Sequence, residues 1–381
     1  MRNLLILVVL LWTHPAWSGD IQLSSQCPAS FEKHEGHCRL VSNYTNYTSL
    51  ENGGVGGLKT GLPAIRDGFT AEEIDLGRYL FFDPLLSGNG KQACASCHNP
   101  DKGFADGRQF SLGSTGLETT RNAPSLWNVG FLKRFFLDGR AATLEEQMQG
   151  PLYSKAEMNS SPDKILANLN GNKTYRRLFA TAYATSFVQP KADIKIDQVY
   201  RSIAAFETSL ISLNSRYDLY AHGFPDALNK QEIAGLNVFR SFVARCAECH
   251  TPPLFSNQQI VVIGTPEPPG HAFDPGAGSY SAEPRLRGGF KVPSLRNVEL
   301  TAPYMHSGRF KTLREVVSFY NEGRGHAVPK EEKLLLHWHI HEPKLTDVEL
   351  DRLVDFLKTL TDESFRPQRP TVLPSGLSAS K

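Results

Sequence analysis

Two short motifs, each a pair of cysteines separated by two residues and followed by a histidine, constrain this chain of 381 residues more than any other feature. They read Cys94-Ala-Ser-Cys97-His98 and Cys246-Ala-Glu-Cys249-His250. This spacing is that of c-type haem attachment, in which two thiols bond to one porphyrin and the adjacent histidine ligates its iron. A redox dithiol is the alternative for one such motif, but it does not require the histidine that follows both. The sequence therefore predicts two covalently bound c-type haems.

A set of matches recurs downstream of each haem motif at a constant offset of 169 residues. Pro124 to Val129 matches Pro293 to Val298, Gly139-Arg140 matches Gly308-Arg309, and Thr143-Leu144 matches Thr312-Leu313. Self-similarity at a fixed offset indicates a repeated structural unit. We therefore expect an all-α fold of two c-type cytochrome lobes related by internal duplication, each with one covalently attached haem.

Local signals support helices and divide the chain. Thr70, Asn229 and Thr346 each stand three residues before a glutamate and just ahead of apolar stretches, as in a helix-capping box. The range 196–213 has helical apolar spacing, whereas 264–289 is rich in Pro and Gly and predicts a long loop. Strand patterns are scarce. The expected parts are a signal peptide (1–18), an N-terminal segment (19–64), two haem domains (65–212 and 213–365) and a flexible tail (366–381).

The N-terminus predicts export. Arg2 precedes an apolar run that is too short to span a bilayer, and a small-residue pattern ends at Ser18, where we expect cleavage. Together with two c-type haems, this favours a periplasmic protein without a membrane span in its mature form. Cys27 and Cys38 are then expected to form a disulfide under oxidising conditions. Lys plus Arg (41) nearly balance Asp plus Glu (39), and no basic run stands out, so nucleic-acid binding is not expected.

The environment of each iron decides between electron transfer and catalysis, because a peroxide-activating haem needs an open axial position. Residues 99–134 contain neither His nor Met, so the first haem is expected to have one. Gln147 and Glu157 follow further on, and a carboxylate in a partly dry pocket can move a proton between peroxide oxygens. Taken alone, Glu157 also fits an ordinary surface carboxylate.

The second lobe differs at the corresponding positions. Tyr304-Met305-His306 stands where the first lobe has Phe135-Phe136-Leu137, so three potential ligands replace apolar side chains. A phenolate stabilises oxidised iron, whereas Met favours the ferrous state. This asymmetry favours an enzyme over a plain dihaem electron carrier, in which both irons would be fully ligated.

With these residues in view, the chain resembles the bacterial dihaem cytochrome c peroxidase family over about residues 65–365. The resemblance rests on the haem pair, on Asp138-Gly-Arg140 and on the range 290–308. It is closer to the MauG branch, which includes MbnH, than to the conventional peroxidases. Those have a His in the loop after the first haem and a Met some fourteen residues beyond the His of Tyr-x-His; here that loop has no His, and the later position is Tyr320.

The resemblance implies roles for several residues. Tyr304 would be the sixth ligand of the second haem, opposite His250, and Gln147 and Glu157 would line the open pocket of the first. Asn122 would bind a calcium ion between the haems. Hydrogen peroxide would generate a bis-Fe(IV) state that oxidises a side chain, usually tryptophan, of a secreted or periplasmic partner protein such as a small metal-binding protein of MbnP type. The alternative is a conventional peroxidase that takes electrons from a small cytochrome c.

Three positions depart from the family pattern or remain unassigned by it. Leu137 stands where the family has an inter-haem Trp, with Trp127 and Phe135 as candidate substitutes, and Ala244 stands where MauG has a surface relay Trp. The segment His337-Trp338-His339-Ile-His341 fits a transition-metal site with copper as one candidate, an exposed relay at Trp338, or a polar interhelical loop.

Overall fold

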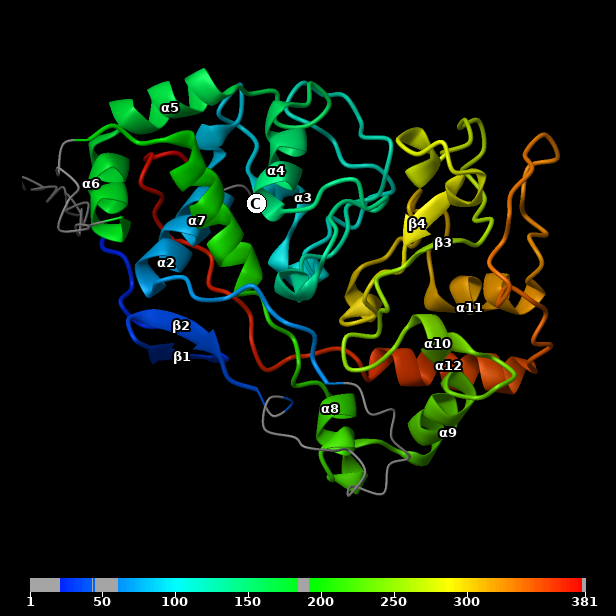
Figure 1. Cartoon of the computed structure of the whole chain (residues 1–381). Coiled ribbons are helices and arrows are strands. Elements are labelled where there is room, and N and C mark those ends of the chain that lie inside the picture. Colours follow the sequence, from blue (N-terminus) through cyan, green and yellow to red (C-terminus); the bar gives the residue numbers. More distant parts are fainter. Residues whose placement is uncertain (1–20, 43, 45–60, 184–191, 379–381) are drawn as a thin grey trace, which may run out of the picture.

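The computed structural model describes residues 21–42, 44, 61–183 and 192–378 (Figure 1). The predicted signal peptide over residues 1–18 lies outside this range. Most of the regular secondary structure in the described residues is helical, as expected. The expectation of an all-α fold needs one correction, because two small antiparallel sheets are present: β1 (Phe31–His34) with β2 (His37–Leu40), and β3 (Ile260–Val262) with β4 (Gly289–Lys291). Strands of three or four residues are too short to show a two-residue hydrophobic period.

The helices fall into two groups along the chain. The first comprises α2 (Ala71–Phe82), α3 (Cys94–Cys97), α4 (Leu144–Tyr153), α5 (Pro162–Gly171), α6 (Lys173–Ala182) and α7 (Ile196–Thr208). The second comprises α8 (Arg216–Ala221), α9 (Lys230–Phe239), α10 (Cys246–Cys249), α11 (Leu313–Glu322) and α12 (Asp347–Lys358). Each group buries its own apolar cluster, one built around residues 76–204 and the other around residues 217–360. Figure 1 shows the two groups on opposite sides of the molecule.

The predicted helix starts are confirmed. Thr70, Asn229 and Thr346 each form a complete capping box at the beginning of α2, α9 and α12. The predicted helix over 196–213 begins at Ile196 but already ends at Thr208. Beyond that point the backbone bonds to Asn128 instead: the Asn128 N–H donates to the Leu210 carbonyl at 2.8 Å.

Each group contains one close helix crossing, α2 on α7 and α9 on α12. At both crossings a glycine faces the backbone of the partner helix: a Cβ on Gly77 would lie 1.8 Å from the Ser202 oxygen, and one on Gly235 would lie 1.9 Å from the Arg352 oxygen. Real Cβ atoms do not approach a carbonyl oxygen so closely. The two crossings are therefore built in the same way, as an internal duplication predicts.

The repeated Pro-Ser-Leu-x-Asn-Val segments adopt the same backbone. Asn128 and Asn297 both have a left-handed conformation, with φ of 62° and 58°, and each precedes a 3-10 turn. Both bind Ser212, which lies between the two groups. Asn128 exchanges two hydrogen bonds of 2.9 Å with the Ser212 backbone, and the Asn297 amide donates to the Ser212 hydroxyl at 2.8 Å. All of these groups are buried.

The N-terminal segment is held against the first group of helices. Cys27 and Cys38 are joined by a disulfide with an S–S distance of 2.03 Å. Cys38 is only 1% exposed, and its N–H donates to the Phe69 carbonyl at 2.8 Å. The disulfide therefore closes the β1–β2 hairpin next to the start of α2.

Within the expected flexible tail, residues 366–378 are described, and they pack against the rest of the protein. Leu373 is 3% exposed and packs into the cluster that contains Phe104 and Trp127, and the Asn172 amide donates to the Pro374 carbonyl at 3.1 Å. Figure 1 shows this red segment running from α12 back to the first group. A single apolar anchor among Pro, Gly and Ser leaves no periodic signal in the sequence, which is why docking was not predicted.

The Pro- and Gly-rich range 264–289 is irregular, as predicted. It contains two 3-10 turns, Ala277–Ser279 and Pro284–Leu286, and ends where β4 begins.

Candidate haem sites

Each haem motif forms one helical turn that places its cysteines and histidine together. In α3 and in α10 the two cysteines begin and end the turn, and the histidine N–H closes it by donating to the first cysteine's carbonyl at 2.9 Å in both cases. None of the four cysteines is in a disulfide. This geometry leaves both thiols and the imidazole free to bind one planar haem.

The two histidines are oriented in the same way. His98 Nδ1 lies 2.9 Å from the carbonyl oxygen of Phe104, and His250 Nδ1 lies 3.0 Å from that of Phe255. Both phenylalanines are fully buried and have a left-handed backbone, with φ of 61° and 54°. A hydrogen bond from Nδ1–H to a carbonyl leaves Nε2 as the ligand atom.

Burial lowers the pKa of His98 and of His250, which favours the neutral imidazole that iron ligation requires. The residues present thus fit two covalent haems, with Cys94, Cys97 and His98 at the first and Cys246, Cys249 and His250 at the second. When bound, such haems supply one-electron chemistry and, where an axial position is open, reaction with peroxide.

The first site contains the carboxylate that the sequence singled out. Glu157 is half-buried after α4, and burial raises its pKa, partly offset by a hydrogen bond with Ser154 and by the charge of Arg140. Its charge in turn contributes to raising the pKa of the Cys97 thiol. Glu157 therefore lies near the first haem motif. Gln147 is half-buried on α4, the helix that leads to Glu157.

A second carboxyl group at the first site was missed by the sequence reasoning. Glu207 on α7 is 6% exposed, and its Oε2 has no hydrogen-bond partner among the described residues. Burial, with the charge of Glu145, raises its pKa to about 8, and Glu207 contributes to raising the pKa of the Cys94 thiol. The available signal was a Glu directly after the buried run Ile203–Phe206, on a helix whose other charged residues, Asp197 and Arg201, are exposed.

At the second site, the structure distinguishes two tyrosines. Burial and the neighbouring Cys249 and Cys246 raise the pKa of Tyr320 on α11. Tyr304 has a pKa raised to about 12 by burial and by Glu299, with no contribution from the cysteines. The structure therefore brings Tyr320 next to the second pair of thiols. In the comparison with the family pattern, Tyr320 is only the position where conventional peroxidases have Met.

The neighbours of Tyr304 have structural roles. His306 Nε2 lies 2.9 Å from Glu267 Oε1, and its ring stacks on Phe290 with centroids 4.0 Å apart. The His306 carbonyl accepts a hydrogen bond of 2.8 Å from the N–H of Asn122, the predicted calcium ligand. The Asn122 amide also donates to the Arg108 carbonyl at 2.7 Å. Asn122 thus connects the two groups of helices.

Leu137, which stands where the family has an inter-haem Trp, lies where the two groups of helices meet. The Leu137 carbonyl accepts a hydrogen bond of 2.7 Å from the Lys291 N–H. Trp127 is 4% exposed and packs edge-on against Phe104, with centroids 5.0 Å apart, so its indole contacts the residue that orients His98. Phe135 lies in the first apolar cluster and bridges to Ala141.

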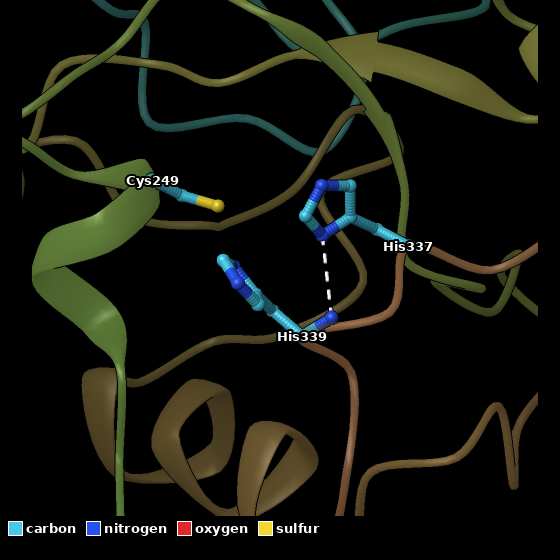
Figure 2. Close-up of side chains that lie close together, drawn as sticks. All are labelled: Cys249, His337 and His339. Carbon is cyan, nitrogen blue, oxygen red and sulfur yellow. Dashed lines mark hydrogen bonds between the residues drawn. The ribbon is translucent and has the colours of Figure 1, made fainter. Parts of the chain in front are cut away.

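Two of the three alternating histidines, His337 and His339, lie beside Cys249 of the second haem motif (Figure 2). His337 and His339 each place a ring nitrogen near the Cys249 sulfur, with the three ligand atoms within 4.8 Å of one another. His341 has a different partner, because its Nε2 donates to the Val243 carbonyl at 3.0 Å. The structure therefore places His337 and His339, but not His341, beside Cys249. The segment is part of the irregular connection between α11 and α12.

No helix within the described residues is long and apolar enough to cross a membrane.

Comparisons with known proteins agree with this arrangement. A sequence profile of di-haem cytochrome c peroxidases matches residues 71–226. The methylamine utilization protein MauG of Methylophilus methylotrophus is 30% identical over 302 residues, covering 79% of this chain and 86% of the relative. The cytochrome c551 peroxidase of Nitrosomonas europaea is 32% identical over 310 residues, covering 80% and 84%.

A crystal structure of a MauG-like protein associated with microbial copper homeostasis is also similar. It superimposes with a TM-score of 0.71 and 34% identity, over 81% of this chain and 95% of that one. The paired attachment motifs, the duplicated helix crossings and these similarities together show that the chain belongs to the di-haem cytochrome c peroxidase family.

Proposed function

We propose that this protein is a periplasmic enzyme that uses hydrogen peroxide to oxidise a tryptophan side chain of a secreted partner protein at long range. One observation supports it above the others: the two haem motifs have different surroundings. The first has a carboxyl group close by and no His or Met over residues 99–134. The second has a tyrosine close to its thiols. Such a difference is expected where one iron reacts with peroxide and the other stores oxidising power.

Glu157 and Gln147 would act on peroxide at the first site. The Glu157 carboxylate would accept a proton from one peroxide oxygen and deliver it to the other, which leaves as water, while the Gln147 amide would hold the peroxide in place. A carboxyl group whose pKa is raised by burial can both accept this proton and release it again. Two electrons from the partner and two protons complete the reduction of each peroxide to two waters.

Tyr320 and His250 would together hold the second iron. The electrostatic interaction of Tyr320 with Cys246 and Cys249 supports this assignment over Tyr304, which the family resemblance had implied. A phenolate is a hard anionic donor and stabilises the higher oxidation states of iron. Asn122 would hold a calcium ion where the two groups of helices meet, and residues 1–18 would direct export to the periplasm.

The direct test mixes one equivalent of hydrogen peroxide with the as-isolated diferric protein and follows both irons by Mössbauer spectroscopy. If both irons are oxidised beyond the ferric state without prior reduction, the proposal stands. If the protein reacts only after one haem has been reduced, the proposal is wrong.

The second candidate is a conventional peroxidase that receives electrons from a small cytochrome c. The 32% identity to the Nitrosomonas europaea cytochrome c551 peroxidase favours it. It predicts steady peroxide turnover with reduced cytochrome c and an inactive diferric form. The partner of the first candidate would instead be a protein that gains a stable modification, such as a small secreted metal-binding protein of MbnP type.

A further inference from the structure

The segment 337–341 has no part in the function proposed so far, yet it lies directly on the second haem motif. The His341 imidazole is bonded to the Val243 carbonyl, three residues before Cys246. The Arg245 guanidinium lies over the Trp338 ring, 5.0 Å from its centroid. Two separate contacts therefore attach this segment to the chain that leads into α10.

Trp338 is exposed to an unusual degree. The chain has four tryptophans, of which Trp12 and Trp17 lie in the predicted signal peptide. Of the other two, Trp127 is 4% exposed and Trp338 is 69% exposed. The neighbouring Phe242 and Val243 are also exposed, at 90% and 53%. Exposed aromatic side chains with apolar neighbours are typical of surfaces that contact another protein.

Trp338 is separated from the second haem motif by a single side chain. The ring centroids of Trp338 and His339 lie 3.5 Å apart. A His339 ring nitrogen lies within 4.8 Å of the Cys249 sulfur, which points toward the two imidazoles in Figure 2. In the mature protein that sulfur is bonded to the porphyrin. A continuous line of contacts thus runs from the attachment sulfur to the surface.

We propose that Trp338 is the residue through which electrons from the partner protein enter the second haem. This inference rests on the proposed function, in which a protein supplies the electrons that reduce peroxide. Trp338 gives one electron to the oxidised haem and then takes one from the partner. Two such transfers supply the two electrons that reduce each peroxide. The Arg245 cation above the ring disfavours a lasting positive charge on the indole, so oxidised Trp338 releases its N–H proton to water and regains one when it is reduced.

The test introduces the oxidising equivalent from the surface, so that it does not depend on peroxide chemistry. Photogenerated tris(bipyridine)ruthenium(III) is added in solution to the holoenzyme with its second haem reduced, and oxidation of that haem is followed by absorbance. In Trp338→Phe, which keeps a ring over His339, we expect oxidation to slow by about tenfold, equivalent to about 1.4 kcal/mol of barrier. Phe224→Leu, at an equally exposed aromatic (61%) elsewhere in the same lobe, should match the wild type.

Equal rates in Trp338→Phe and the wild type would overturn the inference. The same variant is also mixed with peroxide in the diferric state, where the first reaction should keep its wild-type rate because Glu157 and Gln147 are unchanged. If the wild type itself does not react there, the proposed function fails, while the ruthenium experiment still decides the role of Trp338.

Discussion

Gly77 faces the carbonyl oxygen of Ser202 so closely that a Cβ at this position would lie 1.8 Å from it. The axes of α2 and α7 can approach in this way only because no side chain stands between them. The same relationship joins Gly235 to Arg352 in the second lobe, where the corresponding distance is 1.9 Å. Each haem motif thus follows a helix that makes a close backbone contact at a glycine.

Gly77→Ala should therefore destabilise the protein. Alanine normally favours a helix, but here its methyl group forces α2 away from α7, and we expect a loss of roughly 3 kcal/mol in the free energy of unfolding. Denaturant unfolding of the holoprotein measures it. The matched control is Gly171→Ala in α5, where an added Cβ meets nothing within 4 Å and stability should hold or rise slightly. Equal stability of the two variants would contradict the crossing geometry.

Glu157→Gln should slow the reaction of the diferric protein with peroxide. Glutamine keeps the shape of the side chain but cannot accept the proton, so we expect a loss of about a hundredfold in the second-order rate constant, measured by stopped-flow absorbance. In the wild type this rate should fall as the pH drops through the raised pKa of Glu157, and in the variant it should be flat. Glu118→Gln, at an exposed carboxylate, serves as the control; a similar loss there would remove the special role of Glu157.

Tyr320→Phe and Tyr304→Phe should give opposite results. Loss of the Tyr320 hydroxyl removes the proposed ligand of the second iron, so its electron paramagnetic resonance signal should change, whereas Tyr304→Phe should leave the spectrum unaltered. Tyr320→Met should raise the reduction potential of the second haem, because a thioether favours ferrous iron. A changed spectrum in Tyr304→Phe alone would instead support Tyr304 as the ligand, as the family resemblance implies.

Glu207 should make stability depend on pH. Its pKa is about 8 in the folded protein against an ordinary value of 4.5, so between these values the folded state holds a proton that the unfolded chain has released. The free energy of unfolding should therefore fall as the pH rises from 4.5 to 8, by up to about 1.4 kcal/mol per pH unit. Glu207→Gln should flatten this part of the profile. Parallel profiles for variant and wild type would show that Glu207 does not titrate in this window.

Much of this organisation could be predicted from the sequence because it depends on local or repeated signals. The capping boxes at Thr70, Asn229 and Thr346 involve residues only three apart, and they set the helix starts correctly. The repeat was visible because Asn128 and Asn297 need the same left-handed backbone in both lobes, which keeps their surroundings alike.

The remainder depends on contacts between distant parts of the chain. Nothing near Leu373 in sequence indicates that it packs on Trp127, and nothing near Glu207 indicates that it faces Cys94. The resemblance pointed to Tyr304 rather than Tyr320 for the same reason. Both tyrosines follow the second haem motif along the chain. Only the packing of α11 brings one of them, Tyr320, close to the thiols.

Ser212 binds both left-handed asparagines, one through its backbone and the other through its hydroxyl. The two halves of the molecule are thus joined at a buried contact, in addition to the contacts of Asn122 and Leu137. The distance between the two proposed haem sites then depends in part on the backbone at Ser212. Each pocket is free to change its ligands and its proton donors during evolution without altering that spacing, so one scaffold can serve catalysts as different as a peroxidase and a protein-modifying enzyme.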